Sequence, residues 1–145
     1  MLNLDMIAYN PSGDHYNEAY LYSTPASDPL RLGFQNSLAT YGGITAYMPE
    51  DVPYADHAMF EDYGFAATTL IEYSWDTNPY YHTLSDAVNM NDYIDYTYAT
   101  NMTRGAAAYL ADNAGITPEP ATWLLLVVGM GITALRRRKL AKDAA

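Results

Sequence analysis

The order of hydrophobic and polar positions changes its period several times along residues 1–113, which predicts strands interleaved with helices. Four short segments are apolar, either alternating or continuous, and we expect them to be strands: 2–9, 16–23, 44–48 and 65–71. Three segments repeat apolar residues at helical spacing, and we expect helices over 28–41, over 58–63 and from Asn91 or Asp92 to Asp112. Strands that alternate with helices predict an α/β sandwich with a largely parallel sheet.

The segment after residue 117 has a different character. Pro118, Glu119 and Pro120 end the predicted long helix, because proline cannot continue the helical hydrogen bonds. Residues 121–135 carry no charge, and a basic cluster follows at once: Arg136, Arg137, Arg138 and Lys139. A helix over 121–135 spans about 22 Å against about 30 Å of hydrocarbon, and basic side chains that reach toward the headgroups extend it.

The basic cluster also predicts an orientation. Positive residues beside a membrane span stay on the cytoplasmic side, so we expect a transmembrane helix over 121–135 and a cytoplasmic tail over 136–145. Residues 1–117 would then lie across the membrane. The short length of the apolar run leaves a buried core helix as the alternative.

Charge and composition exclude several classes of protein. The 145 residues include 7 basic and 17 acidic ones, a net charge of −10, and five of the basic residues lie in the last ten positions. Residues 1–135 are therefore strongly acidic and would repel a phosphate backbone, so we expect no nucleic-acid partner. The sequence contains no cysteine, which excludes disulfides, thiolate metal ligands and cysteine nucleophiles.

Asp5 and His82 are the first candidates for chemistry. Asp5 interrupts an apolar strand, where an ionised carboxylate is costly unless it is paired or bound to a cation. The carboxyl end of a strand is also where ligands collect in α/β sheets, although a helix cap or a solvent-facing position would explain Asp5 as well. His82 lies in an aromatic loop and offers the imidazole nitrogen that zinc prefers, or it packs as an ordinary hydrogen-bonded residue.

Three further residues have supporting roles in this hypothesis. Asp86 follows His82 by four positions and would orient its ring as a hydrogen-bond acceptor, or cap the next helix. Asp56 and His57 are adjacent, so their side chains cannot easily bind one metal together. We therefore expect them to form a structural hydrogen-bonded pair.

Taken in order, these residues belong to longer motifs. The motifs are Asn3-Leu4-Asp5-Met6, Ala55-Asp56-His57-Ala58-Met59-Phe60 with Gly64-Phe65-Ala66-Ala67, and Tyr81-His82-Thr83 with Asp86. Their order resembles the C-terminal half of the M-28 metallopeptidases, a family that includes bacterial aminopeptidases. The resemblance implies part of a three-layer sandwich around a mixed sheet, with two zinc ions that act together in removing the N-terminal residue of a peptide substrate.

The same resemblance assigns roles to individual residues. Asp5 would bind one zinc ion and His82 the other, while Asp56 and His57 would shape the pocket without binding metal. The family also uses a His-x-Asp pair and a Glu-Glu pair, which supply further ligands and the general base, and neither pair occurs here. We therefore expect a C-terminal fragment of a peptidase that is inactive alone. The alternatives are a non-catalytic surface module and a matrix- or carbohydrate-binding protein that displays its tyrosines.

The C-terminal segment resembles a second known pattern. Pro118-Glu119-Pro120, the apolar run and the arginine cluster match the order of the PEP-CTERM sorting signal of exported bacterial proteins. The resemblance implies export to the cell envelope, a single-pass anchor, and processing near Pro-Glu-Pro by an exosortase-type enzyme. We accordingly divide the chain into a peptidase-like part (1–113), a linker (114–120), a membrane helix (121–135) and a basic tail (136–145).

Overall fold

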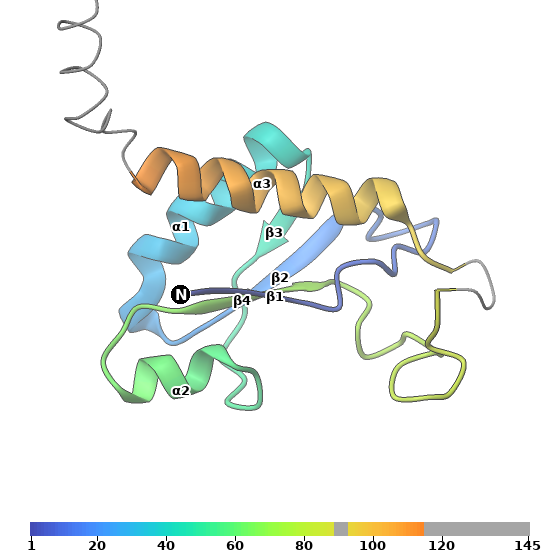
Figure 1. Cartoon of the computed structure of the whole chain (residues 1–145), viewed down its shortest axis with the longest axis horizontal. Coiled ribbons are helices and arrows are strands. Elements are labelled where there is room, and N and C mark those ends of the chain that lie inside the picture. Colours follow the sequence, from blue (N-terminus) through green and yellow to red (C-terminus); the bar gives the residue numbers. More distant parts are fainter. Residues whose placement is uncertain (89–92, 115–145) are drawn as a thin grey trace, which may run out of the picture. The chain divides into compact units, whose positions relative to one another are not determined.

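The computed structural model describes residues 1–88 and 93–114 and contains a four-stranded sheet with helices on both faces (Figure 1). The strands are β1 (Leu2–Asp5), β2 (Glu18–Tyr22), β3 (Thr45–Tyr47) and β4 (Thr68–Glu72). The helices are α1 (Asp28–Ser37), α2 (His57–Asp62) and α3 (Tyr96–Ala114), with short helical turns at η1 (Pro25–Ser27) and η2 (Leu38–Gly42). The predicted order of strands and helices is therefore correct.

The sheet is mixed, and its strand order is β1-β4-β2-β3. β1 pairs with β4 in parallel, β2 pairs with β3 in parallel, and β4 pairs with β2 in the antiparallel direction. The expected mixed α/β sheet is confirmed. Because β1 and β4 are parallel neighbours, their carboxyl ends meet at one edge of the sheet, and this edge positions the candidate site described below.

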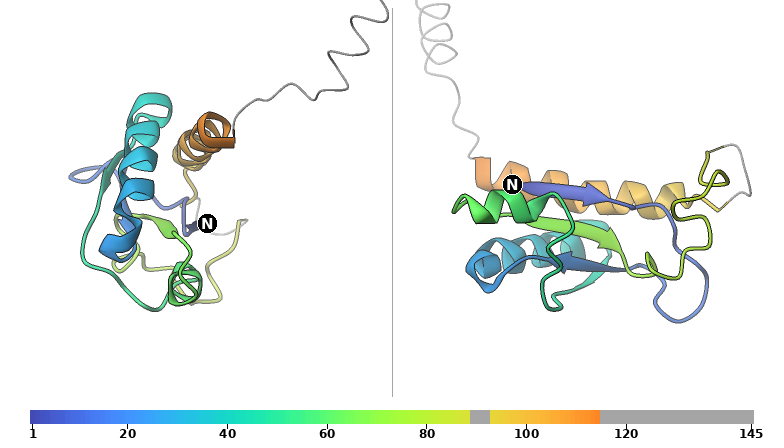
Figure 2. Two further views of the ribbon diagram at one scale, coloured as in Figure 1. Left: turned by 90° about the vertical axis from the view of Figure 1, so that its left-hand side faces the viewer. Right: turned by 90° about the horizontal axis from the view of Figure 1, so that it is seen from below.

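The core lies between the sheet and the helices α1 and α3, while α2 covers the opposite face (Figure 2). Period-two alternation places Ala19 and Leu21 of β2 on the core face, where both are fully buried. Leu70 of β4, Phe34 of α1 and Met102 of α3 complete the centre of this cluster. Burial of these apolar side chains holds the two helices against the sheet.

A glycine allows α3 to lie close to the end of α1. A Cβ atom at Gly105 would lie 2.7 Å from Leu38 Cδ2 and 2.8 Å from Leu38 Cα. The hydroxyl of Ser37 donates a hydrogen bond to the carbonyl oxygen of Gly105 at 2.9 Å. The helices therefore touch through backbone at this point, and a larger residue at 105 would force them apart.

Two boundaries differ from those expected. The strand predicted over 2–9 ends at Asp5, because Met6 takes a left-handed conformation (φ 49°) that no strand can continue. The long helix begins at Tyr96, and its cap is Asp95, whose side chain accepts a hydrogen bond from the backbone of Tyr98 at 2.9 Å. The expected caps, Asn91 and Asp92, lie outside the described residues.

Ala114, the first residue of the predicted linker, is the last residue of α3. The rest of the linker, the predicted membrane helix and the basic tail lie outside the described residues. Within 1–88 and 93–114, no helix combines the length and the apolar character that crossing a membrane requires. Residues 1–113 form one compact unit.

Candidate functional site

One predicted ligand ends a strand of the sheet, and the other lies in the segment that follows the neighbouring parallel strand. Asp5 is the last residue of β1 and is exposed. His82 lies in the segment that follows β4, and Figure 1 shows this segment beyond the carboxyl end of that strand. Residues at the carboxyl ends of parallel strands are placed where α/β proteins bind ligands.

The ring of His82 is exposed and lies against an aromatic neighbour. It stacks on Tyr81, with ring centroids 4.0 Å apart and an angle of 25° between the planes. The backbone of His82 is left-handed (φ 55°), an uncommon conformation for a residue with a Cβ atom. Tyr81 in turn meets Trp75 edge to face at 6.3 Å. An exposed imidazole held by aromatic contacts is available as a nitrogen donor.

Asp86, the expected partner of His82, has a different partner. Its carboxylate accepts a hydrogen bond from the Tyr93 hydroxyl, and this bond raises the pKa of Tyr93 to about 12. Tyr93 stacks on Tyr80, with ring centroids 4.2 Å apart. Among the described residues, no hydrogen bond joins Asp86 to His82. Asp86 therefore anchors the end of the loop through Tyr93.

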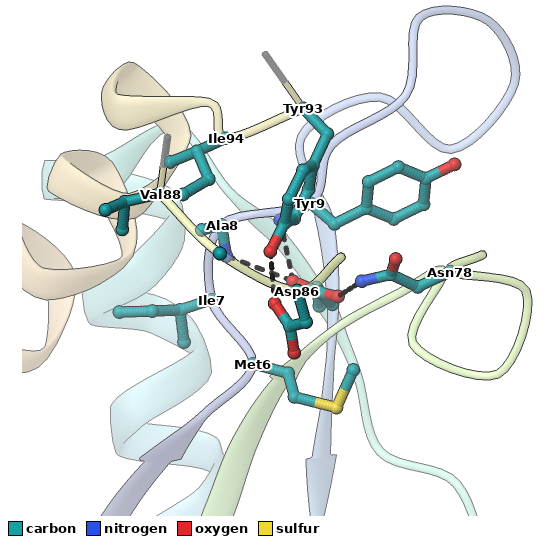
Figure 3. Close-up of a pocket in the computed structure, with 11 residues that line it drawn as sticks. Met6, Ile7, Ala8, Tyr9, Asn78, Asp86, Val88, Tyr93 and Ile94 are labelled. Carbon is teal, nitrogen blue, oxygen red and sulfur yellow. Dashed lines mark hydrogen bonds between the residues drawn. The ribbon is translucent and has the colours of Figure 1, made fainter. Parts of the chain in front are cut away.

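A cavity of about 240 Å³ lies between the chain after β1 and the loop after β4 (Figure 3). Its wall comprises residues 6–9, Glu72, Asn78, 86–88, Tyr93 and Ile94. Asp5 and His82 do not line it; Asp5 comes directly before the lining residue Met6, and His82 lies between the lining residues Asn78 and Asp86. The cavity marks the place where these two segments approach one another.

Glu72 is a buried acid that lines this cavity. It is the last residue of β4, and only 1% of it is exposed to solvent. Burial raises the pKa of its carboxyl group to about 7, against the opposing effect of hydrogen bonds from Tyr9, Asn78 and Ala8, and the charge of Asp86 raises it further. Sequence reasoning missed Glu72, although a charge that ends an apolar strand was the signal that identified Asp5.

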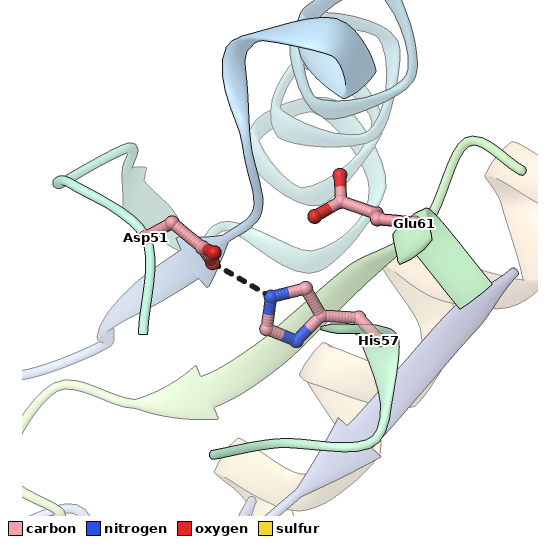
Figure 4. A group of neighbouring side chains, drawn as sticks. All are labelled: Asp51, His57 and Glu61. Atoms are coloured by element: carbon pink, nitrogen blue, oxygen red, sulfur yellow. Dashed lines mark hydrogen bonds and ion pairs between the residues drawn. The ribbon is translucent and has the colours of Figure 1, made fainter. Parts of the chain in front are cut away.

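A second cluster lies on the other face of the sheet, where α2 packs. Asp51, His57 and Glu61 bring one donor atom each to within 4.8 Å of the others (Figure 4). His57 is fully buried; its Nε2 atom lies 2.8 Å from Asp51 Oδ1 and its Nδ1 atom 2.9 Å from Thr69 Oγ1. The expected pair of Asp56 and His57 is therefore wrong, since the acid that holds His57 is Asp51.

Asp56 itself is exposed at the residue before α2, and its side chain caps no backbone group there. It lines a separate cavity of about 290 Å³ together with Asp51 and Glu61. These adjacent residues point in different directions, because His57 is buried against the sheet while Asp56 faces solvent. Of the two, His57 is the one that contributes to the packing of α2 on the sheet.

The cluster of Asp51, His57 and Glu61 differs from Asp5 and His82 in how free its donor atoms are to bind a metal. Both ring nitrogens of His57 have hydrogen-bond partners, and the Glu61 carboxylate accepts hydrogen bonds from Thr24 and Ser27. A metal in this cluster would have to displace these bonds. Asp5 and His82 are exposed and offer a carboxylate oxygen and an imidazole nitrogen, the donors that zinc uses together with sulfur.

The tyrosines of the sheet pack mainly on one another. Tyr73 is stacked on both Tyr20 and His15, with centroids 4.5 Å and 4.0 Å apart, so its two ring faces are both covered. Tyr47 meets Tyr73 edge to face at 5.8 Å. This cluster therefore covers the ring of Tyr73, while 42% of Tyr47 stays exposed to solvent.

Comparison with known proteins agrees with the observed fold. A model of peptidase family M28 matches residues 1–110. Two crystal structures of the Legionella pneumophila LapA aminopeptidase share the fold, at 22% and 21% identity and TM-scores of 0.61 and 0.62. Each match covers 74% of this chain, but only 29% and 30% of the LapA chains, so the chain spans less than a third of their length. No curated protein sequence matches. The family match over most of the chain shows that this protein belongs to peptidase family M28.

Proposed function

We propose that this chain contributes Asp5 and His82 to a two-zinc centre that removes the N-terminal residue from peptides. The support for the proposal is that Asp5 ends β1, that His82 lies in the segment after the neighbouring parallel strand β4, and that both are exposed in a chain of the M28 family. The carboxylate of Asp5 would bind one metal ion and the imidazole of His82 the other. Zinc in such a centre polarises the scissile carbonyl and lowers the pKa of bound water.

We further propose that the remaining ligands and the general base come from polypeptide outside this sequence. A catalytic zinc ion takes about three protein ligands, and one residue per ion cannot complete either site. The 145 residues contain neither a His-x-Asp nor a Glu-Glu pair, and the LapA chains are more than three times as long as the matched region. The chain alone would therefore bind zinc weakly and hydrolyse no peptide.

Zinc titration of the isotopically labelled full chain, in mild detergent, tests the ligand assignment. Imidazole nitrogen signals separate His82 from the buried His57, and we expect Zn²⁺ to shift those of His82. Asp5→Asn should weaken this response by removing an anionic ligand, while Asp112→Asn, which changes an exposed aspartate near the end of α3, serves as the matched control. A response at His57, or an equal loss in both variants, would contradict the proposal.

An activity assay tests the incompleteness of the site. We expect no zinc-dependent release of the N-terminal residue from a leucyl chromogenic peptide by this chain alone. Zinc-dependent hydrolysis that Asp5→Asn abolishes would show that the chain is sufficient. The coding sequence upstream of the first codon offers a second test, since the proposal requires in-frame His-x-Asp and Glu-Glu motifs there.

For residues 118–142 we propose export to the cell envelope and anchoring, with the basic end in the cytoplasm and processing near Pro118-Glu119-Pro120 by an exosortase-type enzyme. The support is the order of the three sequence features. Alkaline extraction of membranes from expressing bacteria should leave the chain in the pellet. Deletion of 121–139 should release it, and extraction of the intact chain would refute the anchor.

A further inference from the structure

The Glu72 carboxylate joins two segments that are far apart in the sequence. Its Oε2 atom accepts hydrogen bonds from the backbone nitrogens of Ala8 and Tyr9, at 3.0 Å and 2.7 Å. Its Oε1 atom accepts a hydrogen bond from Asn78 Nδ2 at 3.0 Å. Each oxygen therefore accepts hydrogen bonds from a different segment, one after β1 and one after β4.

On the first side, Glu72 determines how the chain leaves β1 after Asp5. The Met6 carbonyl accepts a hydrogen bond from the Glu72 backbone at 2.9 Å, and Met6 then turns the chain with its left-handed conformation. The carboxylate accepts hydrogen bonds from the backbone nitrogens of Ala8 and Tyr9, two and three residues further on. The segment that follows Asp5 is thus held by both the backbone and the side chain of Glu72.

On the second side, Glu72 holds the turn that leads to His82. Asn78 donates to the carboxylate through its side-chain amide, and its Oδ1 atom accepts a hydrogen bond from the Tyr80 backbone at 3.0 Å. The Asn78 carbonyl accepts another from Tyr81 at 3.2 Å. The Asn78 amide has an NH₂ donor on one side and an oxygen acceptor on the other. The acceptor oxygen of Glu72 therefore orients the NH₂ group toward itself.

An apolar residue of similar size would fill the position of Glu72 without the cost of burying a charge, yet it would leave the backbone donors of Ala8 and Tyr9 unpaired. The carboxylate is the group that satisfies donors from both segments at once. Its function is therefore to connect these segments.

We propose that Glu72 is a positioning residue that sets the spacing between Asp5 and His82 by holding the segments that carry them. This inference rests on the proposed zinc site. Glu72 does not touch the metal or the substrate in this scheme, and it acts through Ala8, Tyr9 and Asn78. The mechanism is the one by which outer hydrogen-bond partners orient metal ligands.

The Glu72→Gln variant tests the connection with little change in shape. If the glutamine oxygen accepts from Ala8 and Tyr9, its NH₂ group faces the NH₂ group of Asn78, and two donors repel. The double variant Glu72→Gln with Asn78→Asp restores a donor–acceptor pair at this contact and still offers an oxygen to Tyr80. Glu61→Gln is the matched control, because Glu61 also accepts several hydrogen bonds but at the amino end of β4.

Zn²⁺ titration monitored at the His82 ring, with the full chain in mild detergent, gives the first readout. We expect Glu72→Gln to weaken the apparent affinity by about 10-fold or more, the usual effect of losing an outer hydrogen-bond partner. The double variant should recover the affinity of the parent, and Glu61→Gln should stay close to it. Parent affinity in Glu72→Gln, or an equal loss in Glu61→Gln, would overturn the proposal.

Amide hydrogen exchange without metal gives a second readout that does not depend on zinc. Faster exchange at Tyr80 and Tyr81 in Glu72→Gln, reversed in the double variant and absent in Glu61→Gln, is the expected result. Unchanged exchange at these amides would refute the connection even if zinc binds. If instead exchange behaves as expected but the parent shows no zinc response at His82, the proposed function fails and the connection between the segments stands.

Discussion

The buried carboxyl group of Glu72 makes a specific prediction about the pH dependence of stability. Its pKa is 4.5 in an unfolded chain and about 7 in the fold, where burial disfavours the charged form. A pKa that rises on folding stabilises the protein at pH values below the unfolded pKa. This contribution decreases as the pH increases from about 4.5 and is lost once it passes about 7. The difference in pKa corresponds to about 3 kcal/mol.

Replacing the acid with an amide isolates this contribution. The glutamine in Glu72→Gln cannot ionise, so the variant lacks the pH dependence of the unfolding free energy that Glu72 causes. Any loss of stability from the missing hydrogen bond is the same at every pH and does not affect this comparison. We expect the unfolding free energy of the parent minus that of the variant to decrease by about 3 kcal/mol between pH 4.5 and pH 8. Urea unfolding of both proteins, monitored by circular dichroism at closely spaced pH values, measures this difference.

The neighbours of Glu72 provide a control for the assignment. Among the described residues, Asp86 and the hydroxyls of Tyr93 and Tyr98 interact electrostatically with the carboxylate, and the charge of Asp86 raises the pKa of Glu72. Asp86→Asn should therefore move the midpoint of the pH dependence to lower pH. A difference between parent and Glu72→Gln that stays constant across the pH range would refute the reasoning, because it would mean that the carboxyl group titrates alike in both states.

Three other substitutions test the fold. Gly105→Ala should destabilise the protein by about 1–3 kcal/mol in urea unfolding, because the added Cβ atom would overlap Leu38. Alanine is the better helix former, so a stabilised variant would contradict the close contact. Asp95→Ala should cost about 1 kcal/mol and loosen the first turn of α3 in hydrogen exchange, since the cap on the Tyr98 amide is lost; an unchanged first turn would exclude this cap. His57→Ala should destabilise by about 3 kcal/mol or more, because it leaves a cavity and two unpaired partners, and a calorimetric midpoint equal to that of the parent would rule out the buried network.

The order of elements could be predicted because its causes are local. A strand alternates every two residues and a helix repeats every 3.6, so the pattern identifies each element without knowledge of its neighbours. The strands over 16–23 and 44–48 and the helix over 58–63 were located to within two residues. The pattern misplaces a boundary where a distant group decides it, as at Met6, whose carbonyl oxygen accepts a hydrogen bond from the backbone of Glu72.

Residues of the candidate site could be predicted where a short segment marks them, but their distant partners could not. Asp5 and His82 stood out as a charge in an apolar strand and an imidazole in an aromatic loop, which are properties of short segments. The partner of His57 could not be found in this way, because Asp51 and Thr69 reach its ring from a loop and from β4. Adjacency in the sequence suggested Asp56, whose side chain faces solvent instead.

By itself, the sequence determined the α/β class, the order of the elements and the motifs that resemble M28 peptidases, since these depend on neighbouring residues. Only the tertiary structure decided which acids are buried and what they hold. Glu72 meets the backbone of Ala8 and Tyr9 across 64 and 63 positions of the chain, and its pKa depends on how completely these segments exclude water. Burial and hydrogen-bond satisfaction are properties of converging surfaces, which exist only once the segments have packed together.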